Sequence, residues 1–211
     1  MSVVPSSRFN RRTLLGRMGA AVAASCGASL PGFVGAQTAS AGNVAVVADL
    51  AGLAQLWRRE GGVLLIRHAA TEAGLGDPPG FVLGQCSTQR NLSAAGRQAS
   101  VALGEWMRAQ QLQPDAVRSS PWCRCQDTAR LAFGRFEDWT ALGSTFAGQG
   151  DAAAQQKALR DRLQAMHRGR TEVWVTHQVV MTGLTGAYPA LGEGFVVDRQ
   201  GRLLARAGLA A

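Results

Sequence analysis

Hydrophobic and polar positions along the chain predict strands and helices in turn. Two hydrophobic runs of strand length, Val63–Ile66 and Val173–Val175, are uninterrupted, which is typical of strands covered on both faces of a sheet. Elsewhere, hydrophobic residues recur at helical spacing. The predicted helices are one capped by Asp49, one capped by Ser93, one from Pro121 to about Phe133, and one near 152–167. We therefore expect an α/β domain of three layers, in which helices cover both faces of a mostly parallel central sheet.

Two segments depart from this alternation. Residues 73–91 are rich in Gly and Pro and form a long loop, and loops of this length inside a compact domain are usually functional. Near the end of the sequence, Phe195–Asp198 and Leu203–Arg206 flank a turn that contains Gly201, which predicts a hairpin. The loop is the segment in which we expect substrate contacts.

The first 36 residues have the pattern of an export signal. Four arginines lie in the first twenty positions, and no acidic residue precedes Asp49. Arg11 and Arg12, followed by one spacer and two leucines, match the twin-arginine pattern, and an uncharged segment rich in Ala and Gly comes next. We expect cleavage after Ala36, with Ala41 as the second candidate, because both end a small-x-Ala sequence. The twin-arginine export machinery is therefore an expected partner of the N-terminus.

This interpretation divides the chain into an export signal, residues 1–36, a linker, 37–48, and a domain, 49–211. A buried N-terminal helix, a membrane anchor and a lipoprotein acceptor at Cys26 are the alternatives. The apolar segment is short for a membrane span and no later segment resembles one. We therefore expect a periplasmic protein whose mature chain has no membrane span.

Composition and charge exclude further classes. With 211 residues, 46% of them hydrophobic, the chain has enough apolar surface to bury one core, which excludes a disordered protein. Removing the four N-terminal arginines leaves 18 basic against 14 acidic residues, so the net charge falls from +8 to +4. The smaller charge weakens the case for a nucleic-acid partner, and we expect none.

Cysteine usage agrees with an oxidising compartment. Once the signal is removed, Cys86, Cys123 and Cys125 remain. We expect a disulfide between Cys86 and either Cys123 or Cys125, because the last two are too close in sequence to pair easily with each other. A zinc site is the alternative, but three cysteines without a fourth nearby ligand support it weakly.

Two of the three histidines directly follow the buried-strand runs. His68 comes two residues after Ile66, and His177 comes two residues after Val175. Because the carboxyl ends of parallel strands are where open α/β sheets bind ligands, adjacent strands would bring these imidazoles together. His167 lies among Arg and Gly residues and is expected to be a solvated residue at a helix end.

Four segments in a fixed order carry a resemblance to a known family: Leu64–Glu72, Asn91–Ala99, Ser119–Ala129 and Val175–His177. They are similar to the Arg-His-Gly/Ala-x-Thr, Leu-Ser/Thr-x-x-Gly-x-x-Gln-Ala and Ser-Ser-Pro-x-x-Arg-x-x-x-Thr-Ala motifs and to the late strand-end histidine of the histidine phosphatase superfamily. The resemblance extends over roughly residues 62 to 185. It implies the phosphoglycerate-mutase-like fold and phosphoryl transfer through a phosphohistidine.

The resemblance also implies a role for each matching residue. His68 is the expected nucleophile, Arg67 and Arg124 are the expected phosphate clamps, and His177 is a further donor to the transferring group. These roles suit the chemistry, because a neutral imidazole is both a nucleophile and a leaving group, and guanidinium groups hold phosphoryl oxygens in pairs. Neither a metal nor a cofactor is expected. Weaker candidates for substrate binding, for which solvated loop positions are the alternative, are Thr71, Glu72, Gln89, Arg90 and Asn91.

The sequence departs from the family at the proton donor. The place where the family often has a Glu falls near Ser144, and Gln178 follows His177 where another branch has an acid. The only carboxylates we expect near the site, none of them well placed by motif, are Glu72, Glu137 and Asp138. A leaving group that needs little protonation, such as that of a phosphoramidate or an acidic phosphate, would suit such a site.

Three functions compete on these grounds. The first is a periplasmic phosphatase that hydrolyses a small phosphomonoester or phosphoramidate through phosphorylated His68. The second is a catalytically weak protein that binds or senses phosphate or another anion with the same pocket. The third is a metal- or redox-active protein built on Cys123 and Cys125. A mutase is less favoured because export removes the protein from glycolytic substrates.

Overall fold

The computed structural model describes residues 45–46 and 49–209 of the 211. All of them belong to one unit, Gly42–Ala211. The expected export signal and most of the expected linker lie outside the described residues. Within the part of the chain that is described, no helix is both long and apolar enough to cross a membrane.

A seven-stranded sheet forms the centre of this unit, in the order β1-β7-β6-β2-β5-β3-β4. β6 is antiparallel to both of its neighbours, and the other four pairs are parallel, which confirms a mostly parallel sheet and the terminal hairpin of β6 and β7. β1 was not expected, because its residues fall in the predicted linker. The strands are β1 (Ala45–Val46), β2 (Gly62–Arg67), β3 (Ala116–Ser119), β4 (Glu137–Asp138), β5 (Thr171–Thr176), β6 (Glu193–Val197) and β7 (Leu203–Gly208).

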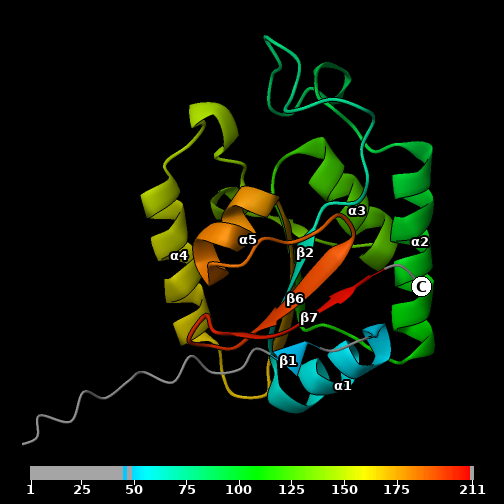
Figure 1. The fold of residues 1–211 in the computed structure, drawn as a ribbon, viewed down its shortest axis with the longest axis vertical. Helices are drawn as coiled ribbons and strands as arrows, with labels where there is room; N and C mark the ends of the chain where they lie inside the picture. Colours follow the sequence, from blue (N-terminus) through cyan, green and yellow to red (C-terminus); the bar gives the residue numbers. More distant parts are fainter. Residues whose placement is uncertain (1–44, 47–48, 210–211) are drawn as a thin grey trace, which may run out of the picture. The chain divides into compact units, whose positions relative to one another are not determined.

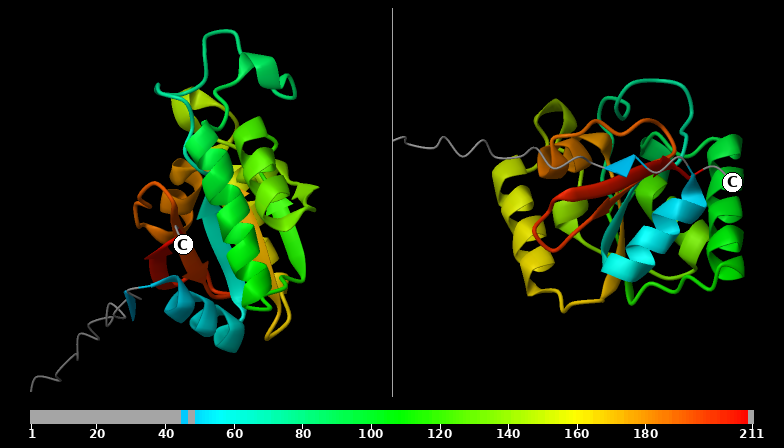
Figure 2. Two further views of the ribbon diagram at one scale, coloured as in Figure 1. Left: turned by 90° about the vertical axis from the view of Figure 1, so that its right-hand side faces the viewer. Right: turned by 60° about the horizontal axis from the view of Figure 1, so that its bottom comes forward.

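Helices cover both faces of the sheet, so the three-layer prediction is confirmed (Figures 1 and 2). α1, α2 and α3 pack on one face, and α4 and α5 pack on the other. Asp49 and Ser93 cap their helices as predicted, each accepting the backbone N–H three residues later. The third helix starts later than predicted, because Trp122 and not Pro121 occupies its N-cap. The helices are α1 (Leu50–Glu60), α2 (Ala94–Ala109), α3 (Cys123–Phe133), α4 (Ala152–Ala165) and α5 (Gln178–Thr185).

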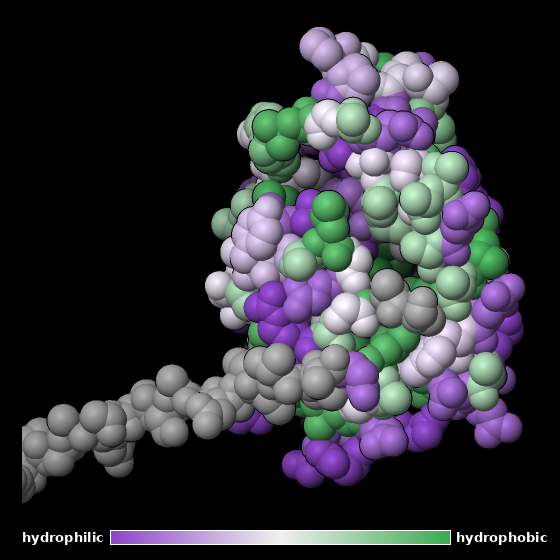
Figure 3. Space-filling view, turned by 45° about the vertical axis from the view of Figure 1, so that its right-hand side comes forward, coloured by the Kyte–Doolittle hydropathy of each residue, from purple (hydrophilic) through white to green (hydrophobic). Residues whose placement is uncertain are grey.

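The strands are buried on both faces because two hydrophobic clusters enclose them. In β2, Leu64 and Ile66 belong to the cluster beneath α1, α2 and α3, whereas Val63 and Leu65 belong to the cluster beneath α4 and α5. This alternation explains why the sequence shows an uninterrupted hydrophobic run. On the outer face drawn in Figure 3, hydrophobic residues are interspersed with hydrophilic ones.

The buried face of α2 differs from the one that hydrophobic spacing predicts. Helical spacing places Ala99 and Gln110 on the face of Leu103 and Met107, but both are exposed, while Gly96, Ser100 and Gly104 are buried. The two glycines allow backbone to approach closely: a Cβ at Gly96 would lie 1.9 Å from the carbonyl oxygen of Ala70. A search for large apolar residues misses such positions, because a buried glycine has no side chain that adds to the hydrophobic pattern.

We expect Gly96→Ala to lower the free energy of unfolding by about 2 kcal/mol, since either α2 or the backbone at Ala70 must shift to admit the methyl group. Denaturant unfolding measures this change. Gly208→Ala is the matched control, because a Cβ at Gly208 meets nothing within 4 Å. Equal stability of the two variants would contradict the proposed close packing.

Candidate active site

Pairing of β2 with β5 brings two distant histidines together. In this parallel pair Arg67 lies opposite Thr176, and the backbone N–H of His68 donates to the carbonyl of Thr176 at 2.9 Å. The rings of His68 and His177 are therefore adjacent, with centroids 5.4 Å apart and an interplanar angle of 67°. The prediction that adjacent strand ends bring the two imidazoles together is therefore confirmed.

His68 is held as a neutral imidazole with one ring nitrogen available. Its Nδ1 lies 2.9 Å from the carbonyl oxygen of Ala69, and because a carbonyl only accepts, Nδ1 carries the proton and Nε2 has a free lone pair. Burial lowers the pKa of His68 to about 3; the hydrogen bond to Ala69 opposes this, and the charges of Arg124 and Arg67 add to it. The ring is therefore an unprotonated nucleophile throughout the neutral range.

His177 is neutral for the same reason. It is buried, and burial first, then the neighbouring His68 and arginines, hold its pKa well below the usual value. Its Nε2 lies 2.8 Å from Oγ of Ser120, which accepts the backbone N–H of Trp122. Ser120 can therefore donate its own proton to Nε2, which leaves the N–H on Nδ1 as a donor.

A cavity of about 220 Å³ adjoins the two histidines and is strongly basic. Arg67, Arg90 and Arg124 line it, with Asp77 as the only carboxylate among its described lining residues, so its net charge is positive by two. The Nε atoms of Arg67 and Arg124 are buried and have no hydrogen-bond partner among the described residues. Unpaired buried N–H groups in a basic cavity favour an anion with several oxygens, such as a phosphoryl group.

α3 connects this cavity to the strand end that carries His68. Thr128 accepts the backbone N–H of Ala69 at 3.1 Å and donates to the carbonyl of Arg124 at 2.8 Å. The first and third motifs of the sequence are thus joined through one hydroxyl group. This contact fixes the start of α3, and with it Arg124, relative to His68.

Asp77, in the long loop, is the residue that sequence reasoning missed. Its carboxylate accepts from Nη1 of Arg124 at 2.6 Å, from the backbone N–H of Arg90 at 3.0 Å and from Nε1 of Trp122 at 3.1 Å. Burial alone raises its pKa, but the hydrogen bonds from these groups and the charge of Arg124 outweigh burial and lower it. One signal was available: Asp77 is the only acidic residue in 73–91.

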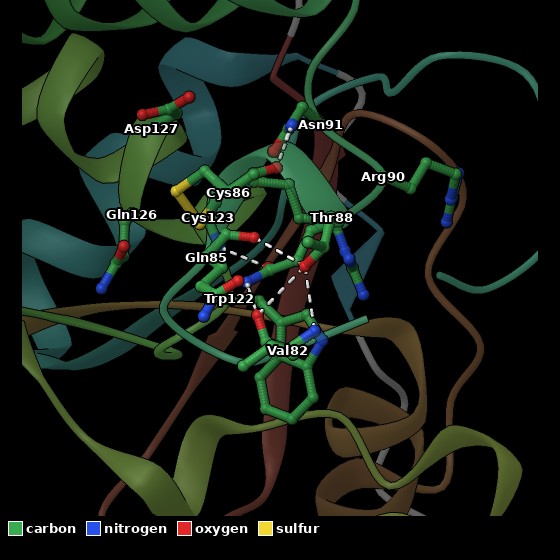
Figure 4. The surroundings of a disulfide bond; sticks show 12 residues. Val82, Gln85, Cys86, Thr88, Arg90, Asn91, Trp122, Cys123, Gln126 and Asp127 are labelled. Carbon is green, nitrogen blue, oxygen red and sulfur yellow. Dashed lines mark hydrogen bonds between the residues drawn. A yellow bond between two sulfur atoms is a disulfide. The ribbon is translucent and has the colours of Figure 1, made fainter. Parts of the chain in front are cut away.

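A disulfide ties this loop to α3. It joins Cys86 to Cys123, one of the two pairings that the sequence left open, and Cys125 is a buried free thiol whose pKa burial raises to about 12. Asn91 donates to the carbonyl of Cys86 at 2.7 Å beside it (Figure 4). Gln89 accepts the backbone N–H of Cys123 at 3.0 Å. Gln89 and Asn91 therefore hold the loop in place.

The structure sorts the remaining candidates. Of the residues singled out from the sequence, Arg67, His68, Arg124 and His177 line the cavity, together with Arg90 and the residues at the expected donor positions, Ser144 and Gln178. The lining does not include Thr71, Glu72, Gln89 or Asn91, although Glu72, Gln89 and Asn91 line a second cavity that shares Asp77 and Arg90 with it. The carboxylates of β4 are also elsewhere, since Glu137 pairs with Arg118 and Asp138 accepts from Gln126. Exposed side chains of Leu75, Phe146 and Tyr188, which the sequence did not single out, contribute to the lining.

Residues 63–141 match the model of the histidine phosphatase superfamily (branch 1). The matched segment is 79 of the 211 residues, so the match is a resemblance of this segment to that superfamily. A comparison with curated proteins finds no match. Among the described residues, no group of three His, Cys, Asp or Glu side chains could hold a metal ion.

Solved structures of similar fold include three at low identity. A mycobacterial glucosyl-3-phosphoglycerate phosphatase is 21% identical, with 57% of this chain and 76% of that one covered and a TM-score of 0.44. The protein histidine phosphatase SixA complexed with tungstate is 17% identical, with 67% and 91% covered and a TM-score of 0.45. A protein from Thermus thermophilus is 18% identical, with 69% and 98% covered and a TM-score of 0.48.

The low pKa of His68 predicts a loss of stability in acid. Its pKa is about 3 in the folded chain against 6.5 for an unperturbed histidine, so the unfolded state binds more protons between these values and stability falls as the pH drops below 6.5. We expect this residue to contribute a loss of about 1.5 kcal/mol between pH 6.5 and pH 5. Denaturant unfolding at the two pH values measures it. His68→Gln should reduce the loss, and an unchanged loss in this variant would contradict the assignment.

Proposed function

We propose that this protein is a periplasmic phosphatase that hydrolyses a small phosphomonoester or phosphoramidate through a phosphohistidine at His68. The observation that carries the proposal is the neutral His68 ring, with Nε2 free, beside a cavity lined by three guanidinium groups. The match of residues 63–141 to the histidine phosphatase model supports the reaction type. The +2 charge of the cavity matches the charge of a phosphoryl dianion.

The reaction has two steps. In the first, Nε2 of His68 attacks phosphorus, and a P–N bond forms while the bond from phosphorus to the leaving oxygen or nitrogen breaks. In the second, water attacks phosphorus, and the P–N bond breaks to release phosphate and restore the imidazole. Arg67, Arg90 and Arg124 hold the phosphoryl oxygens during both steps, and the N–H of His177 adds a further donor.

A second candidate function is phosphate or anion binding without efficient turnover. One observation favours it: the ion pair of Asp77 with Arg124 already occupies part of the clamp, so a ligand has to compete with a carboxylate of the chain. A sensor needs only this competition and no chemical step. The phosphatase is preferred because an unprotonated Nε2 at His68 cannot donate a hydrogen bond to an anion, whereas it can attack phosphorus.

A phosphoenzyme experiment separates the two functions. We expect the purified protein, incubated with labelled phosphoramidate and quenched in base, to carry an acid-labile phosphoryl group. His68→Ala should abolish the adduct, because Nε2 of His177, the other imidazole in the described lining, already accepts from Ser120. His167→Ala, which removes an exposed histidine outside the cavity, should retain it. If the wild-type protein acquires no labelled phosphoryl group but binds vanadate, the sensor is favoured. If His68→Ala carries as much label as the wild type, His68 is rejected as the nucleophile.

The periplasmic location rests on the N-terminal pattern, and the Cys86–Cys123 disulfide suits an oxidising compartment. In a bacterial host with twin-arginine export, we expect the full chain to reach the periplasm with a new N-terminus at Gln37, or at Gly42 if the second site is used. The double variant Arg11→Lys, Arg12→Lys should accumulate as uncleaved precursor in the cytoplasm. Arg8→Lys is the matched control. N-terminal sequencing of fractionated cells is the measurement, and export of the double variant would contradict the pathway.

A further inference from the structure

We propose that Asp77 is the proton donor to the leaving group, and that substrate itself switches Asp77 into this role by sharing the positive charge of Arg124. The proposal deepens the proposed function and rests on it. It supplies the acid that the sequence motifs lack at Ser144 and Gln178, and it comes from a segment with no motif of its own.

The first support for a proton-donor role is the position of Asp77 in the cavity. Its side chain is only 4% exposed, and Asp77 lines the same cavity as His68 and Arg124. No other described residue of the lining carries a carboxylate. The other acidic candidates, on β4 and at Glu72, lie outside the cavity. Asp77 is therefore the one group among the described lining residues that can pass a carboxyl proton to an oxygen bound there.

A bound ligand would affect one hydrogen-bond donor to Asp77, the guanidinium of Arg124, and leave the other two in place. Arg124 Nη1 binds the carboxylate at 2.6 Å, while Nε of the same guanidinium is buried without a partner. A phosphoryl group that binds Arg124 through two oxygens uses the free Nε together with Nη2, so it leaves Asp77 on Nη1 but shares the positive charge of Arg124 with it. The backbone N–H of Arg90 and Nε1 of Trp122 do not depend on Arg124, so they keep the carboxyl group in the cavity.

Binding of the phosphoryl group changes the protonation of Asp77. In the resting site the positive charge of Arg124 keeps the carboxylate ionised. With phosphate bound, that charge is shared with the ligand, and two negative charges now lie beside a buried carboxylate. Both changes raise the pKa of Asp77, because burial and like charge disfavour the ionised form. Asp77 therefore takes up one proton from water when substrate binds.

The proton then follows the two chemical steps. As the P–N bond to His68 forms and the P–O bond to the leaving group breaks, the leaving oxygen takes the proton of Asp77. The resulting carboxylate then accepts a proton from the water that attacks the phosphohistidine, and phosphate leaves. One carboxyl group thus serves as acid and then as base, and the net reaction consumes one water.

Leaving groups of different acidity test this role. Asp77→Asn should slow hydrolysis of an alkyl phosphate, whose leaving oxygen needs a proton, by 100-fold or more in kcat/KM. It should change hydrolysis of 4-nitrophenyl phosphate, whose leaving oxygen needs none, by less than tenfold and should still form the phosphoenzyme from it. Asp77→Glu should recover part of the alkyl phosphate rate. Asp127→Asn, which removes a carboxylate that pairs with Arg97 and Arg130 on the outer side of α3, is the matched control.

The outcomes are distinct. Equal slowing of both substrates would show that Asp77 only positions Arg124, and no slowing of either would show that it takes no part; each result overturns the proposal. A wild-type protein that forms no phosphoenzyme from 4-nitrophenyl phosphate, by contrast, would reject the proposed function itself. If Asp77→Asn folds less stably, the ratio of the two substrate rates remains the criterion, because loss of folded protein lowers both rates equally.

Discussion

The parallel pairing of β2 with β5 is the constraint on which the site depends. Its register sets Arg67 opposite Thr176, so the two histidines leave the sheet together at one edge. Because hydrophobic clusters cover both faces, a shift of one residue would exchange the side chains that face each cluster. The burial that stabilises the sheet therefore also fixes the distance between two groups 109 positions apart in the sequence.

Burial and positive charge act in the same direction on the imidazoles. Both disfavour protonation, so His68 and His177 stay neutral without any partner that removes a proton from them. The guanidinium groups also repel each other. Burial first, and then the positive charge of Arg124, lower the pKa of Arg90. Asp77 offsets part of this repulsion in the resting site, and a phosphoryl anion would offset more.

The long loop, residues 73–91, is attached to the start of α3 at two points. The disulfide from Cys86 to Cys123 holds one part of the loop at the start of α3, and Asp77 holds another part through Arg124 and Trp122. A loop whose only regular structure is one turn of 3-10 helix, Cys86–Thr88, would otherwise lose much entropy on ordering. The covalent bond reduces that loss, and it keeps Asp77 beside Arg124.

The sequence by itself determined the α/β fold and the two strand ends with His68 and His177, because hydrophobic periodicity is a local property of the chain, and the resemblance to a family motif added Arg124. It did not determine β1, the glycine-lined face of α2 or the site of Asp77. Strand pairing and close backbone approach depend on partners distant in sequence, and glycine leaves no hydrophobic signal. The role of Gln89 and Asn91 was likewise decided by the tertiary structure, since only the folded loop turns them toward backbone groups near the disulfide and Asp77 toward the arginines.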